Sequence, residues 1–463
     1  MTYPDEQISL GDVEPIGASA AAKADQPPRG RRQLVALGVT ASVLAGALVV
    51  SSLSRPEPAY QQGSPYQQGP VAGSRSAAAV GSESSSRRDV LARAALQRQQ
   101  QALRAGARRG YVRSWDSKLA ASRRRAATLY ANLQALHATV RSTRYVATAV
   151  GGLPLQQQSR LGGDTWTAEV QLSWRLRGFD SSDALATLRY TFVQRGDDAY
   201  VVDIAAAPGA RRPVWLLGPL VVRRDARTLV AATTPGDADR IDRRLHQAVV
   251  DVGSVVSDWR GGLVAYVPAG TEQLEAVLAA TPGGYSHVAA VTTSVDGSHQ
   301  VDAPVAIVIN PAVLAGLSPV GAHVVITHES THVATEAAAI DVPLWLAEGF
   351  ADYVGVGSVE VPLSVSAGAL VRDVRRNGLP DALPSDADFD TARGDTEVYY
   401  EQAWLAARLI AREHGEARLL AFYERVVANP DRVAPALRIC LHTTRSALTA
   451  EWRTYLRAVV GAA

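Results

Sequence analysis

The pattern of hydrophobic and polar positions divides the N-terminal part of the chain into three stretches. Residues 1–32 are mostly polar, contain Pro and Gly and show no periodicity, which predicts a disordered tail. Residues 33–54 contain the uncharged apolar run 34–53, and a helix of this length extends about 30 Å, enough to cross a membrane. Residues 55–86 repeat Tyr-Gln-Gln-Gly and are rich in Ser, which predicts a flexible linker.

Charged residues beside the apolar run predict its orientation. Only Arg55 and Glu57 lie close after the run, whereas several basic residues lie before it: Lys23, Arg29, Arg31 and Arg32. By the positive-inside rule, the N-terminus lies in the cytoplasm and the rest of the chain lies outside the cell. A cleaved signal peptide is the alternative. The run is longer than a usual signal-peptide core, which favours a single-pass membrane anchor.

Residues 87–230 change from a helical to a strand pattern. Apolar residues recur at helical spacing through residues 87–140. Residues 165–172, 188–193 and 200–204 then alternate as strands do. Helices followed by an antiparallel sheet resemble the NTF2-like α+β fold, whose members hold a small ligand or act as spacers. No catalytic group of residues is visible in this stretch.

Residues 235–463 predict a second α+β domain, which begins with alternating helices and strands. The pattern predicts helices at 237–258 and 271–280, and strands at 263–267, 288–293 and 305–309. An apolar helix follows, and later helices are expected at 365–377, 397–413, 416–428 and 446–460. The expected domain is therefore a mixed sheet, one central helix and a helical lower half.

The central apolar helix carries the motif His328-Glu329-Ser330-Thr331-His332. Residues four apart lie on one face of a helix, so His328 and His332 can direct their rings at one point. Glu348 follows in a second apolar segment and can supply a carboxylate as third ligand. Two imidazoles and a carboxylate are a ligand set for catalytic Zn²⁺, with a fourth position left for water.

Glu329 lies beside the first histidine but off the ligand face, where it can take a proton from a zinc-activated water and pass it to the leaving amine. The alternative is that His328 and His332 are ordinary core histidines. Polar side chains in an apolar helix are costly to bury unless they are paired, and a bound metal would give a reason for this group of polar residues. The independent signal at Glu348 makes the metal site the better interpretation.

These two motifs resemble the gluzincin peptidases, and in particular the peptidase MA-like domains of actinobacterial envelope proteins. The resemblance covers about residues 230–463. It implies a zincin-type fold, with His328, His332 and Glu348 as zinc ligands and Glu329 as general base. It also implies that Asp352 hydrogen-bonds a ligand histidine, which we expect to be His328.

The same resemblance implies a residue that stabilises the oxyanion, and in this family the residue is Tyr or His. Three tyrosines are weak candidates, and the sequence favours a packing role over a catalytic one for each: Tyr353, Tyr399 and Tyr400. An edge strand that pairs with extended substrate is expected within residues 288–309.

Composition narrows the class of protein only slightly. The hydrophobic fraction of 47% is ordinary for a globular chain, and the net charge of +2 does not indicate a nucleic-acid partner. The single Cys440 excludes an intrachain disulfide framework.

The sequence therefore predicts a membrane-anchored zinc peptidase whose peptidase domain is extracellular and acts on peptides or proteins. Two alternatives remain open. The chain could be a catalytically silent zinc-binding scaffold, or an envelope protein in which residues 87–230 sense a ligand. The substrate, endo- or exopeptidase action and the oligomeric state are not determined by the sequence.

Overall fold

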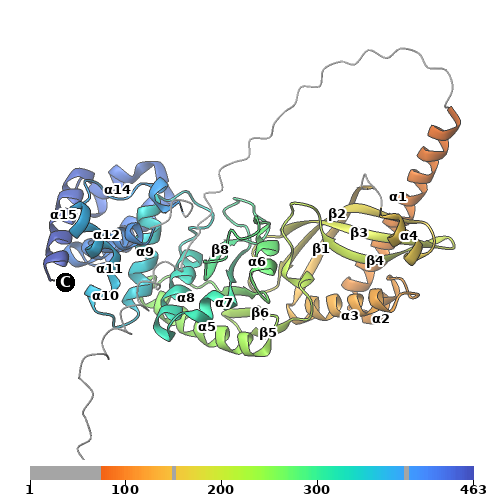
Figure 1. The fold of residues 1–463 in the computed structure, drawn as a ribbon, viewed down its shortest axis with the longest axis horizontal. Helices are drawn as coiled ribbons and strands as arrows, with labels where there is room; N and C mark the ends of the chain where they lie inside the picture. The colour runs from red at the N-terminus through yellow and green to blue at the C-terminus, as the bar shows by residue number, and fades with distance from the viewer. Residues whose placement is uncertain (1–74, 149–152, 391–395, 463) are drawn as a thin grey trace, which may run out of the picture.

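The computed structural model describes residues 75–148, 153–390 and 396–462, and these form an α+β fold, as predicted (Figure 1). The predicted tail (1–32) and transmembrane helix (33–54) lie outside the described residues. Among the helices that are described, none combines the length and the apolar character needed to cross a membrane.

The N-terminal part consists of helices followed by an antiparallel sheet in the order β1-β2-β3-β4. Its elements are α1 (Arg75–Arg104), α2 (Arg108–Arg113), α3 (Ala120–Ala135), β1 (Ala138–Thr148), α4 (Leu155–Leu161), β2 (Thr165–Leu176), β3 (Ala184–Arg195) and β4 (Asp198–Ala206). Because α1 begins at Arg75, residues 75–86 are helical, which shortens the linker predicted for 55–86. The helical pattern also ends earlier than residue 140, since β1 begins at Ala138.

The second sheet has the order β5-β6-β7-β9-β8 and is mixed. Strands β6, β7 and β9 are parallel, whereas β5 and β8 run antiparallel to their neighbours at the two edges. The strands are β5 (Val221–Arg224), β6 (Thr228–Ala232), β7 (Leu263–Val267), β8 (Ala290–Ser294) and β9 (Val305–Ile309). The sheet begins at Val221, so strands β5 and β6 start before the boundary predicted at 230–235.

Helices cover one face of this second sheet, and the N-terminal part covers the other. Residues of α5 (Pro235–Val255), α7 (Pro311–Gly316) and α8 (Pro319–Ala334) share one core with the sheet. On the opposite face, Tyr266 and Val291 share a core with α6 (Thr271–Leu278) and with Trp174 and Trp215 from the N-terminal part. One continuous core therefore joins the two sheets.

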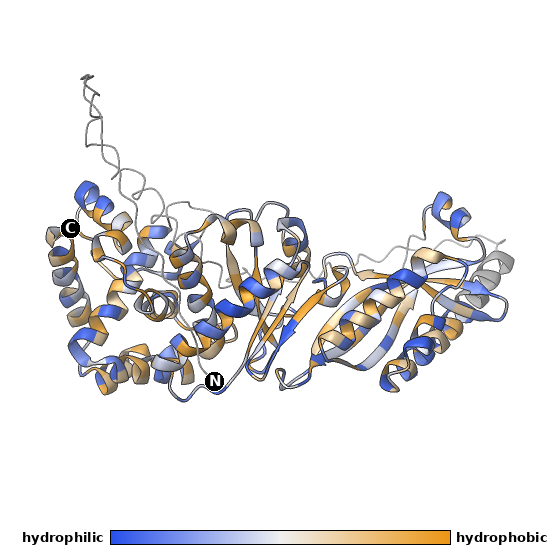
Figure 2. Cartoon of the chain, turned by 90° about the horizontal axis from the view of Figure 1, so that it is seen from below, coloured by the Kyte–Doolittle hydropathy of each residue, from blue (hydrophilic) through white to orange (hydrophobic). Residues whose placement is uncertain are grey.

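A helical half follows α8 and has its own core. Its α-helices are α9 (Leu344–Gly357), α10 (Leu363–Ser366), α11 (Gly368–Asn377), α12 (Glu397–His414), α13 (Glu416–Ala428), α14 (Val433–Cys440) and α15 (Arg445–Ala462). Helix α9 packs between α8 and α12. The helices carry both hydrophobic and hydrophilic stretches, whereas the strands of the second sheet are largely hydrophobic (Figure 2).

Candidate metal centre

Helix α8 carries the two histidines of the motif. It begins at Pro319, and the side chain of Ser318 caps it by accepting a hydrogen bond from the backbone N–H of Gly321. The segment from Val324 to His332 is entirely buried, including its polar residues. The hydroxyls of Ser330 and Thr331 are satisfied by the backbone carbonyls one turn earlier, so they do not compete for the histidines.

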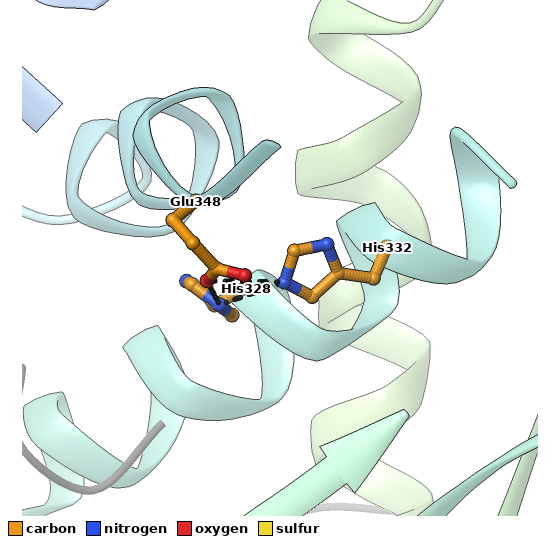
Figure 3. Close-up of side chains that lie close together, drawn as sticks. All are labelled: His328, His332 and Glu348. Carbon is orange, nitrogen blue, oxygen red and sulfur yellow. Dashed lines mark hydrogen bonds and ion pairs between the residues drawn. The ribbon is translucent and has the colours of Figure 1, made fainter. Parts of the chain in front are cut away.

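Helix α9 supplies the carboxylate, and two of its glycines set its position. A Cβ on Gly349 would lie 2.4 Å from the carbonyl oxygen of Ala403 in α12. A Cβ on Gly355 would lie 3.0 Å from the carbonyl oxygen of Val324 in α8. Because these positions lack side chains, α9 can lie close to both neighbours. This close packing brings Glu348 over the histidine face of α8 (Figure 3).

Three potential ligand atoms converge between α8 and α9. The Nε2 atoms of His328 and His332 lie 3.0 Å apart. Oε2 of Glu348 lies 3.2 Å from the first and 3.5 Å from the second. All three side chains are at most 2% exposed, and neither oxygen of Glu348 has a well-aligned hydrogen-bond donor in the described part of the chain. This buried group can hold a metal ion.

The geometry of the triangle fits the ligand shell of a small divalent cation. Ligand atoms at about 2.0–2.1 Å from a tetrahedral Zn²⁺ are about 3.3 Å from one another. The three separations, 3.0, 3.2 and 3.5 Å, bracket that value. Two imidazole nitrogens and one carboxylate oxygen suit zinc and other borderline transition metals better than Ca²⁺ or Mg²⁺, which prefer oxygen ligands.

The electrostatics of the centre also favour a cation. Burial alone would lower the pKa of His328, but the carboxylates of Asp352 and Glu348 raise that pKa well above its usual range. Burial would raise the pKa of Glu348, but His332 and His328 hold it at about 2. Because a histidine ligand must be neutral at the atom that binds the metal, metal binding at this centre competes with protonation.

Asp352 occupies the position next to the first histidine. Its Oδ1 lies 2.7 Å from Nδ1 of His328, which is the contact expected from the sequence. If Nδ1 carries the proton and donates it to Asp352, Nε2 presents its lone pair to the metal position. Asp352 is 1% exposed, so burial protects this contact from water.

Glu329 lies on the side of α8 that faces the sheet. Its Oε2 accepts a 2.6 Å hydrogen bond from the hydroxyl of Thr292 on β8. Strand β8 is the edge of the sheet nearest to the motif, so the edge strand expected within residues 288–309 lies at 290–294. Thr292 was not singled out in the sequence. The only signal for it was a threonine pair directly after the apolar residues 288–291.

The three candidate tyrosines occupy different surroundings. The hydroxyl of Tyr353 donates to Glu416, and Tyr399 is half-buried in the helical core. Tyr400 is buried, and burial followed by the charges of Glu348, Asp352 and Glu329 raises its pKa well above the usual range. Its hydroxyl has no hydrogen-bond partner among the described residues. Of the three, Tyr400 lies nearest to the charges of the metal centre.

A cleft of about 470 Å³ includes His332, one of the three potential ligands, in its lining. The opposite wall comes from the loop between β2 and β3, which includes Phe179, Asp180 and Ser181. Residues from the N-terminal sheet therefore lie beside the candidate site. Nothing in the sequence pattern indicated that residues so distant along the chain would meet.

We compared the chain with family models, curated proteins and solved structures, and no match was found in any of the three comparisons.

Proposed function

We propose that this protein is a zinc-dependent peptidase, built as an NTF2-like part followed by a gluzincin-like peptidase part. The observation that carries the proposal is the buried triangle of His328, His332 and Glu348 next to Glu329. Three protein ligands leave a coordination position open, as catalytic zinc sites do. A Zn²⁺ ion held there would polarise the scissile carbonyl and activate a water molecule.

The protein side chains then have separate roles in this proposal. Glu329 takes a proton from the attacking water and delivers it to the leaving amine. Thr292 holds the carboxylate of Glu329 in place from the edge strand. Tyr400 is the favoured donor to the developing oxyanion, since its hydroxyl is buried, unpartnered among the described residues and close to the site carboxylates. Asp352 positions the ring of His328.

The proposal also includes the position of the site relative to the cell membrane. Residues 33–54 anchor the chain in the membrane, and the charge pattern beside them places the peptidase part outside the cell. The substrate is then a peptide or protein of the cell envelope or of the surroundings.

A catalytically silent zinc scaffold is the second candidate, and one observation favours it. Glu329, Tyr400 and the three ligands are all at most 2% exposed, as in structural metal sites. A structural site, however, needs no acid beside the ligands, and a carboxylate as buried as Glu329 is costly to retain without a role. The two candidates differ in whether peptide bonds are cleaved.

The deciding experiment measures zinc content and peptide cleavage on the full chain. We expect stoichiometric zinc and cleavage of a diverse peptide library. Glu329→Gln should retain zinc and reduce cleavage by about 10²- to 10⁴-fold, since it removes the proton acceptor. Glu424→Gln, at an exposed position in α13, is the matched control and should change neither quantity. Cleavage that survives Glu329→Gln would refute the catalytic role, and zinc binding without any cleavage would support the scaffold.

A further inference from the structure

The cleft beside His332 has an acidic lining. Three acidic residues belong to its lining, Asp180, Asp302 and Glu336, and no described Lys or Arg does. Asp302 and Glu336 are exposed and make no ion pair with another described residue. The guanidinium groups of Arg224 and Arg227 stack on the rings of Phe179 and Trp259 at 4.7 and 4.6 Å, and the charge of Arg224 also acts on Asp180. A cationic group entering this cleft would meet the negative charges of Asp302 and Glu336.

Two aromatic rings complete the cleft. Phe179 and Trp259 lie in its lining, together with small apolar residues such as Ala303 and Ala338. Such a surface covers the methylene stem of a long basic side chain while carboxylates receive its charged end. An acidic side chain would gain the same apolar contacts but would be repelled by the carboxylates. The combination favours Lys or Arg.

The wall from the N-terminal part is fixed by specific contacts. The hydroxyl of Ser182 donates a 2.6 Å hydrogen bond to the carbonyl of Asp302, and the backbone N–H of Leu185 donates to Asp296 at 3.0 Å. The ring of Phe179 packs on Gly262, where a Cβ would lie 2.8 Å from the ring. These contacts hold the β2–β3 loop against the segment between β8 and β9.

A second, independent feature connects this cleft with the metal centre. His332 is 2% exposed and belongs to the cleft lining, and its Nδ1 has no hydrogen-bond partner among the described residues. Its ring directs Nε2 at the metal position. A group bound in the cleft is therefore adjacent to a proposed ligand of the metal.

We propose that this cleft is a specificity subsite of the peptidase and that it binds a Lys or Arg side chain of the substrate close to the scissile bond. The inference rests on the proposed peptidase function and adds the substrate class. It also gives the N-terminal part a direct role, because Phe179 and Asp180 form one wall of the subsite.

The first test is a cleavage assay with the zinc-loaded full chain. Peptides that differ at a single position, carrying Lys, Arg, Gln or Glu, are compared by kcat/KM, and cleavage sites are located by mass spectrometry. We expect Lys and Arg to be preferred over Gln by at least about tenfold at one fixed position relative to the cleaved bond, and Glu to be the poorest. Equal rates for the four peptides would overturn the inference while leaving the peptidase function standing.

Charge reversal tests the residues themselves. Asp302→Lys and Glu336→Lys are combined, because both residues are exposed and belong to the cleft lining. We expect the double variant to lose the preference for basic side chains and to favour Glu. The matched control places lysines at two exposed acids of the helical half, Glu424→Lys and Asp431→Lys, and should keep the original preference. An unchanged preference in the first double variant would overturn the inference.

A binding assay separates this inference from the peptidase proposal. Glu329→Gln should bind a fluorescent Lys-containing peptide at least about tenfold more tightly than its Glu-containing counterpart, as measured by anisotropy. If the wild-type chain cleaves nothing but this preference remains and depends on Asp302 and Glu336, the subsite stands and the peptidase function fails. If neither binding preference nor cleavage is found, both are wrong.

Discussion

The hydroxyl of Thr292 lies 2.6 Å from a carboxylate oxygen of Glu329 and 3.0 Å from the carbonyl oxygen of the same residue. One side chain of the edge strand β8 thus contacts both the main chain and the side chain of the proposed general base. Thr292 and Glu329 are both buried, so water does not compete for this hydrogen bond. The contact couples the strand expected to bind substrate to the residue expected to transfer the proton.

Replacing Thr292 with Val should therefore affect stability and catalysis together. Val has nearly the same shape but leaves the buried carboxylate of Glu329 without its donor. Leaving a buried acceptor unpaired costs about 1–3 kcal/mol, so we expect the free energy of unfolding to fall by about that amount. We also expect kcat/KM to fall by about tenfold or more, since the base loses its positioning contact. Chemical denaturation and peptide hydrolysis measure the two effects.

Thr292→Ser is the control for this prediction, because it keeps the hydroxyl and removes only a methyl group. It should retain most of the stability and activity of the wild-type protein. Equal losses in the Val and Ser variants would show that packing, and not the hydrogen bond, makes Thr292 important.

Asp352 gives a prediction about metal affinity. The carboxylate contacts Nδ1 of His328 at 2.7 Å and is buried with it. Removing such a partner from a ligand histidine typically lowers metal affinity by about 10- to 100-fold. We expect Asp352→Asn to show a loss of this size in chelator competition, while the protein still binds one zinc ion. An affinity equal to that of the wild-type chain would contradict the positioning role.

Local sequence patterns were sufficient to predict much of the C-terminal part. Strands β7 and β9 and helix α13 coincide with the predicted ranges 263–267, 305–309 and 416–428. The pairing of His328 with His332 follows from helical periodicity alone, since both lie on one helix. These features depend on residues that are close together in the chain, which is why they can be predicted from a single sequence.

Long-range relationships could not be predicted in the same way. The hydrogen bond from Thr292 to Glu329, the placement of Tyr400 near the site carboxylates and the approach of Phe179 to the cleft all depend on tertiary packing. The sheet order, in which β9 lies between β7 and β8, is of the same kind. Such contacts depend on which apolar faces pack together, and the local sequence pattern is compatible with several arrangements of the strands and helices.

Glu401 provides a prediction about pH. Burial raises the pKa of this carboxyl to about 8, against the lowering effect of the backbone N–H groups of Leu370 and Ala369, which donate to it. The pKa is higher in the folded protein than the ordinary value of 4.5, so the folded state binds the extra proton. The associated stability is fully present below about pH 4.5 and is lost as the pH rises to about 8.

Glu401→Gln should remove this pH dependence. The amide oxygen of Gln can accept one of the two backbone hydrogen bonds, and the amide has no proton to lose. Loss of the other hydrogen bond lowers the stability of the variant by the same amount at every pH. Relative to the variant, the wild-type chain should lose up to about 1.4 kcal/mol of unfolding free energy per pH unit between pH 5 and pH 8. Urea denaturation at several pH values measures the difference. Parallel stability curves for the two proteins would contradict the assignment.

The glycines of α9 yield the most direct test of how the centre is assembled. A methyl group on Gly349 would lie 2.4 Å from the carbonyl oxygen of Ala403, so Gly349→Ala must displace α9 from α12 and move Glu348 with it. We expect a loss of at least about 2 kcal/mol in unfolding free energy and a clear fall in zinc affinity, because the three ligand atoms no longer converge.

Gly357→Ala, at the end of the same helix, is the matched control, since no described atom lies within 4 Å of its added methyl. It should bind zinc normally and be as stable as the wild-type chain or slightly more stable, because Ala favours helix over Gly. If both variants bind zinc equally well, the approach of α9 to its neighbours does not determine the metal site.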